Sequence, residues 1–395
     1  MSVRKRKWTT NKGEEREVWI VDYKDQRGER HIETFDKKGD AVTRHAEVRI
    51  NVKKGIHVAA SKSITVAEAG KRWADEAEAG GLERATVRTY RQHVDLHIVP
   101  FLGRLKLSEI SVPVVTQFKK DLRAQGRSPA LVRKVLVSLG SLIADAQESG
   151  LAAHNAVREL RRNKRRGERH ARSEKRKLQV GVDIPEPVEV SAILAHGPTR
   201  WRPLLVIAAF TGLRASELRG LRWQDVDLDA GELHVRQRAD RFNEIGAPKS
   251  EAGERTVPFG KIVANTLREW KLRCPKGDAD LVFPTASGQP VEHSNLVRAS
   301  IIPACKVAGL VNEAGEAKYT GLHSLRHFYA SWLINRPQDG GLGLPPKTVQ
   351  ERMGHSSITI TLDTYSHLFK GADDAEEIGK AEEALLHATQ TRHAG

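Results

Sequence analysis

Apolar residues recur at every third or fourth position along much of this chain, a spacing typical of amphipathic helices. Between residues 63 and 158 the spacing predicts successive helices that begin at Thr65, Arg84, Pro113 and Pro129, the second of them ending at Pro100. Each predicted helix has one apolar stripe to bury. We therefore expect residues 63–158 to form an all-α domain.

Near the N-terminus an alternating pattern replaces the helical one. Residues 18–23 and 30–35 alternate between apolar and polar positions, with a turn at Asp25-Gln26-Arg27-Gly28, which predicts a strand pair. A helix is expected from Lys38 to about Lys53. Residues 1–58 thus predict a small α+β domain. The basic cluster at residues 4–7 is either a phosphate-binding arm or a solvated tail.

The last part of the chain, residues 186–395, returns to helical spacing. A strand insert is expected between about Val226 and Phe259, with alternation at 232–236 and 255–259 and with Lys249 near the turn between them. The expected fold class is multidomain and mainly α with small β elements. It comprises the α+β N-terminal domain, the all-α domain and a mainly-α C-terminal domain with a small β-sheet insert and a C-terminal tail.

Residues 159–185 separate the two helical parts and predict a basic linker. Positions 161–177 read RRNKRRGERHARSEKRK, with Ala171 as the lone apolar residue. A segment of this composition cannot bury a core. It is either a flexible solvated tether or a tether that crosses a DNA backbone.

Composition narrows the classes of function. Lys and Arg number 65 against 50 Asp and Glu, a net charge of +15, which favours a polyanionic partner such as nucleic acid. Two cysteines, Cys274 and Cys305, make no disulfide framework, so we expect a cytoplasmic protein. No apolar run reaches the roughly 18 residues of a membrane span. The sequence contains no GxxxxGK[ST] phosphate-binding loop, which argues against ATP-driven chemistry.

Exposed cations on the first two domains and the linker are the candidate DNA contacts. They are Arg4, Lys5, Arg6, Lys7, Arg88, Arg91, His93, Arg127, Arg133, Lys134, Arg165 and Arg166.

The C-terminal domain holds side chains suited to cutting DNA without water or metal. That reaction needs a nucleophile, cations on the nonbridging phosphate oxygens, a proton acceptor for the nucleophile and an acid for the leaving 5′-oxygen. Tyr365 is the candidate nucleophile, Arg214 and Arg326 the phosphate clamp, and Lys249 the acid. His355 either donates a hydrogen bond to the phosphate or helps to accept the tyrosine proton.

Other residues of these motifs lie beside these candidates. Glu217, three residues after Arg214, either orients a catalytic side chain or forms a plain intrahelical ion pair. His323 and Arg326 share a helix face, and His327 is expected to pack. His323 and His327 lack the acidic residue of an HExxH pair, so a metal site is disfavoured.

In combination these motifs resemble the tyrosine recombinase (phage integrase) family. Residues 211–218 resemble its first arginine box, residues 248–258 its lysine hairpin, 323–331 its HxxR box, and 354–357 with 361–367 its last histidine and nucleophile boxes. Residues 63–158 resemble its core-binding domain. Residues 1–58 resemble the arm-binding domain of lambda-like integrases.

The resemblance implies the catalytic set Arg214, Lys249, His323, Arg326, His355 and Tyr365. It also implies a 3′-phosphotyrosyl intermediate, no cofactor, and four protomers on two DNA attachment sites. An excisionase and a DNA-bending host factor are possible partners, on the bacterial nucleoid. The leading hypothesis is an integrase of a phage or mobile element. The alternatives are a chromosome-dimer resolvase, a type IB topoisomerase-like enzyme and an inert DNA-binding regulator.

Overall fold

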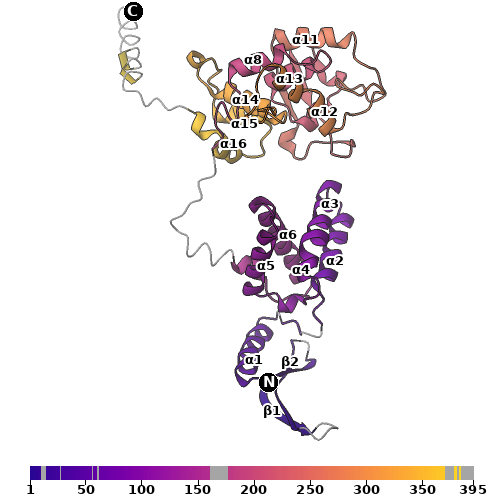
Figure 1. Cartoon of the computed structure of the whole chain (residues 1–395), viewed down its shortest axis with the longest axis vertical. Helices are drawn as coiled ribbons and strands as arrows, with labels where there is room; N and C mark the ends of the chain where they lie inside the picture. The colour runs from indigo at the N-terminus through magenta and orange to yellow at the C-terminus, as the bar shows by residue number, and fades with distance from the viewer. Residues whose placement is uncertain are drawn as a thin grey trace, which may run out of the picture. The chain divides into compact units, whose positions relative to one another are not determined.

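The computed structural model describes residues 1–9, 15–26, 28–55, 57–59, 62–160, 177–369, 378–379 and 382–383. The chain divides into two units, Met1–Ser173 and Glu174–Gly395 (Figure 1). The described part is mainly helical with small sheets, in agreement with the predicted fold class. In this part of the chain, no helix is both long and apolar enough to cross a membrane.

The first unit opens with a three-stranded antiparallel sheet, β1 (Ser2–Thr9), β2 (Glu15–Lys24) and β3 (Arg30–Phe35), in the order β1-β2-β3. Helix α1 (Lys38–Lys53) packs on it, and Val21 and Tyr23 of β2 are buried with Ala41 and Val48 of α1. The two predicted strands and the helix are confirmed.

The solvated-tail interpretation of residues 4–7 is wrong, because these residues belong to edge strand β1. Their backbone pairs with β2 in a register that places Val3 opposite Val21. The charges are also paired: Arg4 contacts Asp22 at 3.1 Å, while Lys5 and Lys7 both contact Glu17. Residues 4–7 therefore form a strand through pairing with the apolar strand β2, although their charged side chains alone would favour a solvated segment.

A helical bundle follows in the same unit. Its elements are α2 (Val66–Ala79), α3 (Arg84–His93), the π-helical segment η1 (Val94–Ile98), α4 (Val99–Leu102), the 3₁₀ turn η2 (Leu107–Glu109), α5 (Val112–Ala124) and α6 (Pro129–Glu148). Thr65 caps α2 through the predicted side-chain bond and closes a capping box with Glu68. Phe118, Leu122, Val135 and Leu139 are among the buried apolar residues, as their spacing predicts.

Two predictions for this bundle are wrong. The second helix does not end at Pro100, because a π turn lets the Val99 N–H bond to the Val94 carbonyl and leaves Pro100 in the first turn of α4, where a missing N–H costs nothing. His93 is not an exposed cation. It is buried, and its Nδ1 lies 2.8 Å from the Ser138 hydroxyl.

The second unit is built from helices around a small sheet. The helices are α8 (Pro187–Ala195), α9 (Arg202–Thr211), α10 (Ala215–Gly220), α11 (Lys261–Lys271), α12 (His293–Ala299), α13 (Ile301–Val307), α14 (His323–Ile334), α15 (Pro346–Met353) and α16 (Ile358–Tyr365). The 3₁₀ turns are η3 (Trp223–Asp225), η4 (Glu251–Gly253), η5 (Pro337–Asp339) and η6 (Ser366–Leu368).

The predicted strand insert is present but more elaborate than a two-stranded hairpin. Strand β5 (Glu232–Val235) pairs with both β4 (Val226–Asp227) and β8 (Arg255–Pro258). A separate hairpin of β6 (Arg238–Ala239) and β7 (Ile245–Gly246) interrupts the connection between β5 and β8. Lys249 follows that hairpin, in an exposed bend before η4.

Helix α9 forms the centre of this unit. Four consecutive residues, Leu204 to Ile207, are each at most 1% exposed, so the helix is covered on every side. It packs against α14 and α11, while α14, α15 and α16 contact one another in succession (Figure 1). Ile184, within the predicted linker, is buried in the same core. The basic run at 161–176, with Arg165 and Arg166, lies outside the described residues.

Candidate active site

The ends of the central helices carry the residues that the sequence singles out. Arg214 immediately precedes α10, His323 and Arg326 begin α14, His355 lies between α15 and α16, and Tyr365 ends α16. Arg326 and Tyr365 are each only 2% exposed. The rigid helices of one core therefore hold side chains that are up to about 150 residues apart in the sequence.

The two predicted phosphate-clamp arginines converge on one turn. Arg326 donates from Nη1 to the Gly212 carbonyl at 2.5 Å and from Nη2 to the Met353 carbonyl, while Arg214 donates from Nη2 to the Gly354 carbonyl at 2.8 Å. Burial and the nearby Arg214 charge lower the pKa of Arg326 to about 9. The guanidinium still carries its charge at neutral pH, so Arg214 and Arg326 concentrate positive charge at this turn, an arrangement suited to an anion.

Glycines are required where the backbone turns into this site. Gly212 has a φ of 61°, and a Cβ added to it would lie 2.2 Å from the ring of Tyr329. Gly354 has a φ of 62°, and a Cβ there would come within 2.9 Å of the Ala252 carbonyl. Both positions need the left-handed conformation and the small size of glycine. The second contact also places η4, and with it the segment after Lys249, against the His355 turn.

Glu217 is buried between two arginines. Its carboxylate accepts from the Arg214 backbone N–H at 2.8 Å and from the Arg214 guanidinium at 2.7 Å. It also accepts from two nitrogens of Arg255, at 2.9 and 3.2 Å. Burial alone would raise the pKa of Glu217, but the Arg255 and Arg214 charges lower it to about 2. Glu217 is therefore both an ion-pair partner of Arg214 and an anchor for a second arginine.

Arg255 is a site residue that the sequence analysis did not assign. It is nearly buried and connects three parts of the site: it bonds to Glu217, to the Gly253 carbonyl of η4 at 2.9 Å, and to the Arg352 carbonyl of α15 at 2.8 Å. One sequence feature could have drawn attention to Arg255: it begins the predicted strand that follows the Lys249 turn. Nothing in the local pattern shows that its side chain points inward.

The Tyr365 hydroxyl has a partner that the sequence analysis expected only to pack. Its oxygen lies 2.7 Å from Nδ1 of His327. Burial raises the pKa of Tyr365 to about 12, although the Arg326 and Arg214 charges oppose the shift. Burial, with the nearby His323 and Arg326, lowers the pKa of His327 to about 4. At neutral pH both side chains are therefore neutral, and the Tyr365 hydroxyl donates this hydrogen bond when the imidazole carries its proton on Nε2.

The other two histidines frame the tyrosine. His355 stacks on the Tyr365 ring, with the ring centroids 6.4 Å apart, and its Nδ1 bonds to the Thr361 hydroxyl at 2.9 Å. Burial and the Arg326 charge lower the pKa of His355 to about 3. His323 is exposed, and its ring meets the His327 ring edge-on at 4.5 Å. Lys249 is also exposed at the surface of this unit.

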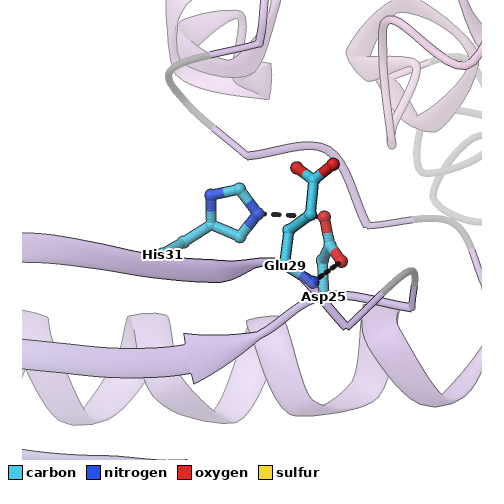
Figure 2. A group of neighbouring side chains, drawn as sticks. All are labelled: Asp25, Glu29 and His31. Atoms are coloured by element: carbon cyan, nitrogen blue, oxygen red, sulfur yellow. Dashed lines mark hydrogen bonds and ion pairs between the residues drawn. The ribbon is translucent and has the colours of Figure 1, made fainter.

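A possible metal-binding group lies elsewhere, in the β2–β3 turn. Figure 2 shows Asp25, Glu29 and His31 close enough together to share a cation. Protein contacts account for their positions: Asp25 accepts from the Glu29 N–H at 3.0 Å and pairs with the His31 ring at 2.9 Å, while Lys62 pairs with Glu29. We therefore interpret Asp25, Glu29 and His31 as side chains that stabilise the turn by bonding to protein groups, and we propose no metal site there.

Among the described residues, the predicted DNA contacts other than His93 are on the surface. Arg6, Arg88, Arg127, Arg133 and Lys134 are exposed. Arg91 is exposed as well, but it pairs with Asp75 at 3.1 Å and with Glu78 at 2.6 Å. These ion pairs lie in solvent and are weak enough for a phosphate to replace the carboxylates.

Comparisons with known proteins identify the family of this chain. The phage integrase family model matches residues 186–371. Tyrosine recombinase XerC of Xanthomonas campestris pv. campestris is 30% identical over 268 residues, covering 67% of this chain and 72% of the relative.

Two solved structures share the fold. The Tn1549 transposon integrase in complex with a circular intermediate DNA has a TM-score of 0.63 at 20% identity, covering 82% of this chain and all of that chain. A lambda integrase tetramer bound to a Holliday junction has a TM-score of 0.55 at 19% identity, covering 89% and 96%. The chain therefore belongs to the tyrosine recombinases, enzymes that cleave and rejoin DNA strands.

Proposed function

We propose that this recombinase is the integrase of a phage or other mobile element and that Tyr365 is its nucleophile. The observation that carries the catalytic part is the position of the Tyr365 hydroxyl. It is buried near Arg214 and Arg326, whose charges act on its pKa, and it is bonded to a neutral histidine. A phenol held beside two guanidinium groups is suited to in-line attack on a phosphodiester.

Each catalytic side chain has a task in this mechanism. Arg214 and Arg326 bind the nonbridging oxygens of the scissile phosphate, and His323 and His355 donate further hydrogen bonds to it. Lys249 protonates the leaving 5′-oxygen. Glu217 keeps Arg214 in place through its bonds to the backbone and side chain of that residue. The product is a 3′-phosphotyrosyl linkage, which a 5′-hydroxyl from a second strand attacks to rejoin the DNA.

The first unit supports DNA binding upstream of the catalytic part. Successive side chains of β1 point to opposite faces, so Val3 packs toward α1 and Arg4 and Arg6 line the opposite face of the sheet. We assign residues 1–58 to an arm-type DNA-binding domain and 63–158 to a core-binding domain. Residues 159–185 are the linker and 186–395 the catalytic domain.

The assembly is proposed from the same relationship. Four protomers would hold two attachment sites, by analogy with the lambda integrase tetramer on a Holliday junction. Attachment-site DNA is the proposed partner. An excisionase and a DNA-bending host factor follow from the family resemblance alone, as does the restraint of Tyr365 by the C-terminal tail, most of which lies outside the described residues.

A chromosome-dimer resolvase is the second candidate, because the Xanthomonas relative is a XerC recombinase. The basic sheet of residues 1–58 favours the integrase, since a resolvase that binds a single core site has no need of a second DNA-binding domain.

The test is recombination by the purified full chain on two plasmid pairs. One pair carries the junction sequences of the protein's own element with their flanking arms, and the other carries the chromosomal dimer-resolution site of its host. The integrase predicts product from the first pair alone, and removal of residues 1–58 abolishes that product while cleavage of an isolated core site persists. Product from the second pair alone would support the resolvase.

A further inference from the structure

The hydrogen bond between His327 and Tyr365 points to a role in the reaction for a residue outside the predicted catalytic set. Both side chains come from helices of one core, α14 and α16, and Tyr365 is 2% exposed. The Nδ1 to Oη distance is 2.7 Å. Contact with the reacting atom itself distinguishes His327 from a residue that only fills space.

Neither of the other two histidines is placed in this way. Nδ1 of His355 is engaged by the Thr361 hydroxyl at 2.9 Å, and its ring lies parallel to the Tyr365 ring, at 10°. His323 is exposed and meets the His327 ring edge-on. Among these histidines, His327 is the one whose nitrogen is bonded to the hydroxyl.

We propose that His327 is the proton acceptor for Tyr365, a proposal that rests on Tyr365 being the nucleophile. As the Tyr365 oxygen forms its bond to phosphorus, the hydroxyl proton moves to Nδ1 of His327. The bond from phosphorus to the 5′-oxygen breaks, and that oxygen takes a proton from Lys249. In rejoining, an incoming 5′-hydroxyl gives its proton to the neutral Lys249 amine as its oxygen bonds to phosphorus. The bond from phosphorus to the Tyr365 oxygen breaks, and the imidazolium returns its proton to that oxygen.

The surroundings of His327 determine when the proton moves. The groups that face it are His323 and Arg326 on its own helix, Tyr365 on α16, and Asp183 in the turn before Ile184. Burial and the neighbouring Arg326 charge disfavour an imidazolium at His327, and burial also disfavours a free phenolate at Tyr365. Transfer before attack is therefore unfavourable. A bound phosphate offsets the arginine charge, so the proton moves together with formation of the oxygen–phosphorus bond.

Two substitutions separate proton acceptance from positioning. His327→Asn keeps an acceptor oxygen near the place of Nδ1 but cannot take a proton, while His327→Phe keeps the ring and removes the acceptor. His234→Asn is the matched control, because Nδ1 of His234, a partly buried residue of β5 in the same unit, also bonds to a hydroxyl, that of Thr256 at 2.9 Å. The assay is single-turnover cleavage of a nicked suicide DNA by the full chain, from pH 6 to 9.

The proposal predicts that both His327 variants cleave on the order of 10²-fold or more slowly at pH 7, while His234→Asn is unchanged. In wild type neither His327 nor Tyr365 titrates between pH 6 and 9, since their pKa values are about 4 and about 12. The cleavage rate should therefore show no dependence on pH from these two groups. In His327→Asn the proton must go to hydroxide, so the rate rises about tenfold per pH unit. A structural defect would lower the rate equally at every pH.

A second substrate separates the proton acceptor from the acid. Sulfur in place of the bridging 5′-oxygen leaves as a thiolate, which needs no proton because a thiol has a pKa of about 8.5. This DNA should restore cleavage to Lys249→Ala and leave the His327 variants slow. Restored cleavage in the His327 variants would overturn the proposal. So would wild-type rates in His327→Asn, or faster cleavage in either variant, which would mean that His327 restrains Tyr365.

The controls separate this proposal from the proposed function. If wild type forms no covalent adduct, the nucleophile assignment fails before His327 is tested. If wild type and the His234 control form the adduct and the His327 variants match their rates and pH profiles, only the proton-acceptor proposal fails. Equal binding of intact DNA by all variants, with cleavage still slow, supports it.

Discussion

The most informative single change outside the reacting groups is Glu217→Gln. Glu217 is 3% exposed and accepts hydrogen bonds from Arg214 and Arg255. Glutamine keeps the shape but removes the charge, and its amide group directs N–H donors at two guanidinium groups. Arg255, whose side chain is 6% exposed, is then buried without a counterion.

The expected loss of stability follows from two independent arguments. Removing one partner of a buried ion pair destabilises a protein by about 3–5 kcal/mol. The pKa of Glu217 falls from 4.5 to about 2, and a change of that size corresponds to about 3 kcal/mol of stability at neutral pH. Both arguments predict that Glu217→Gln lowers the free energy of unfolding of the second unit by roughly 3 kcal/mol.

Native-state hydrogen exchange of the slowest α9 amides measures that free energy for the second unit alone. Asp225→Asn is the matched control: Asp225 is buried, but its partners Arg222 and Arg236 are 27% and 57% exposed, so water can solvate them after the change. The control should lose clearly less stability than Glu217→Gln.

The pH dependence gives a further check. The contribution of Glu217 is complete above pH 4.5, because its pKa is lowered on folding, and it is lost as the pH falls toward 2. The difference between wild type and Glu217→Gln should therefore shrink over that interval. A variant within 1 kcal/mol of wild type at pH 7, with unchanged cleavage, would refute the idea that this ion pair supports the site.

Three other changes test separate parts of the site. Gly212→Ala forces a side chain against the Tyr329 ring in a left-handed conformation, so suicide-substrate cleavage and the melting temperature should both fall. Arg326→Lys loses the planar donors, so cleavage should drop by about 10²-fold or more while gel-shift DNA affinity changes little. The pKa values of His327 and His355 are lowered on folding to about 4 and about 3, so stability is complete above pH 6.5 and falls as the pH drops below it. Urea unfolding at pH 7.5 and 5.5 should show a loss of up to about 1.4 kcal/mol per pH unit for each histidine.

The helical elements could be predicted because their signals are local. The apolar stripe that contains Phe118 and Leu122, and the Thr65 cap, depend on residues within a few turns of each other. Strand β1 could not be predicted from the sequence, since residues 4–7 are charged at every position and form a strand only through pairing with β2. Tertiary pairing overrides composition in such a segment.

The candidate site shows the same division. Tyr365 and Arg326 could be predicted as site residues because each stands in a short motif whose spacing can be read directly from the sequence. The contacts of Arg255 and His327 depend on the direction of side chains across separate elements. Sequence spacing predicts which residues share a helix face, but not which neighbouring helix that face meets.

The most direct test of the central claim is denaturing electrophoresis of the full chain after incubation with a nicked suicide DNA carrying its core site, in EDTA. Tyr365→Phe is the comparison, because it keeps the ring in the core and removes the hydroxyl bonded to His327. The account predicts a covalent protein–DNA adduct from wild type and none from Tyr365→Phe. An adduct of equal yield from both proteins would show that another residue attacks the phosphate.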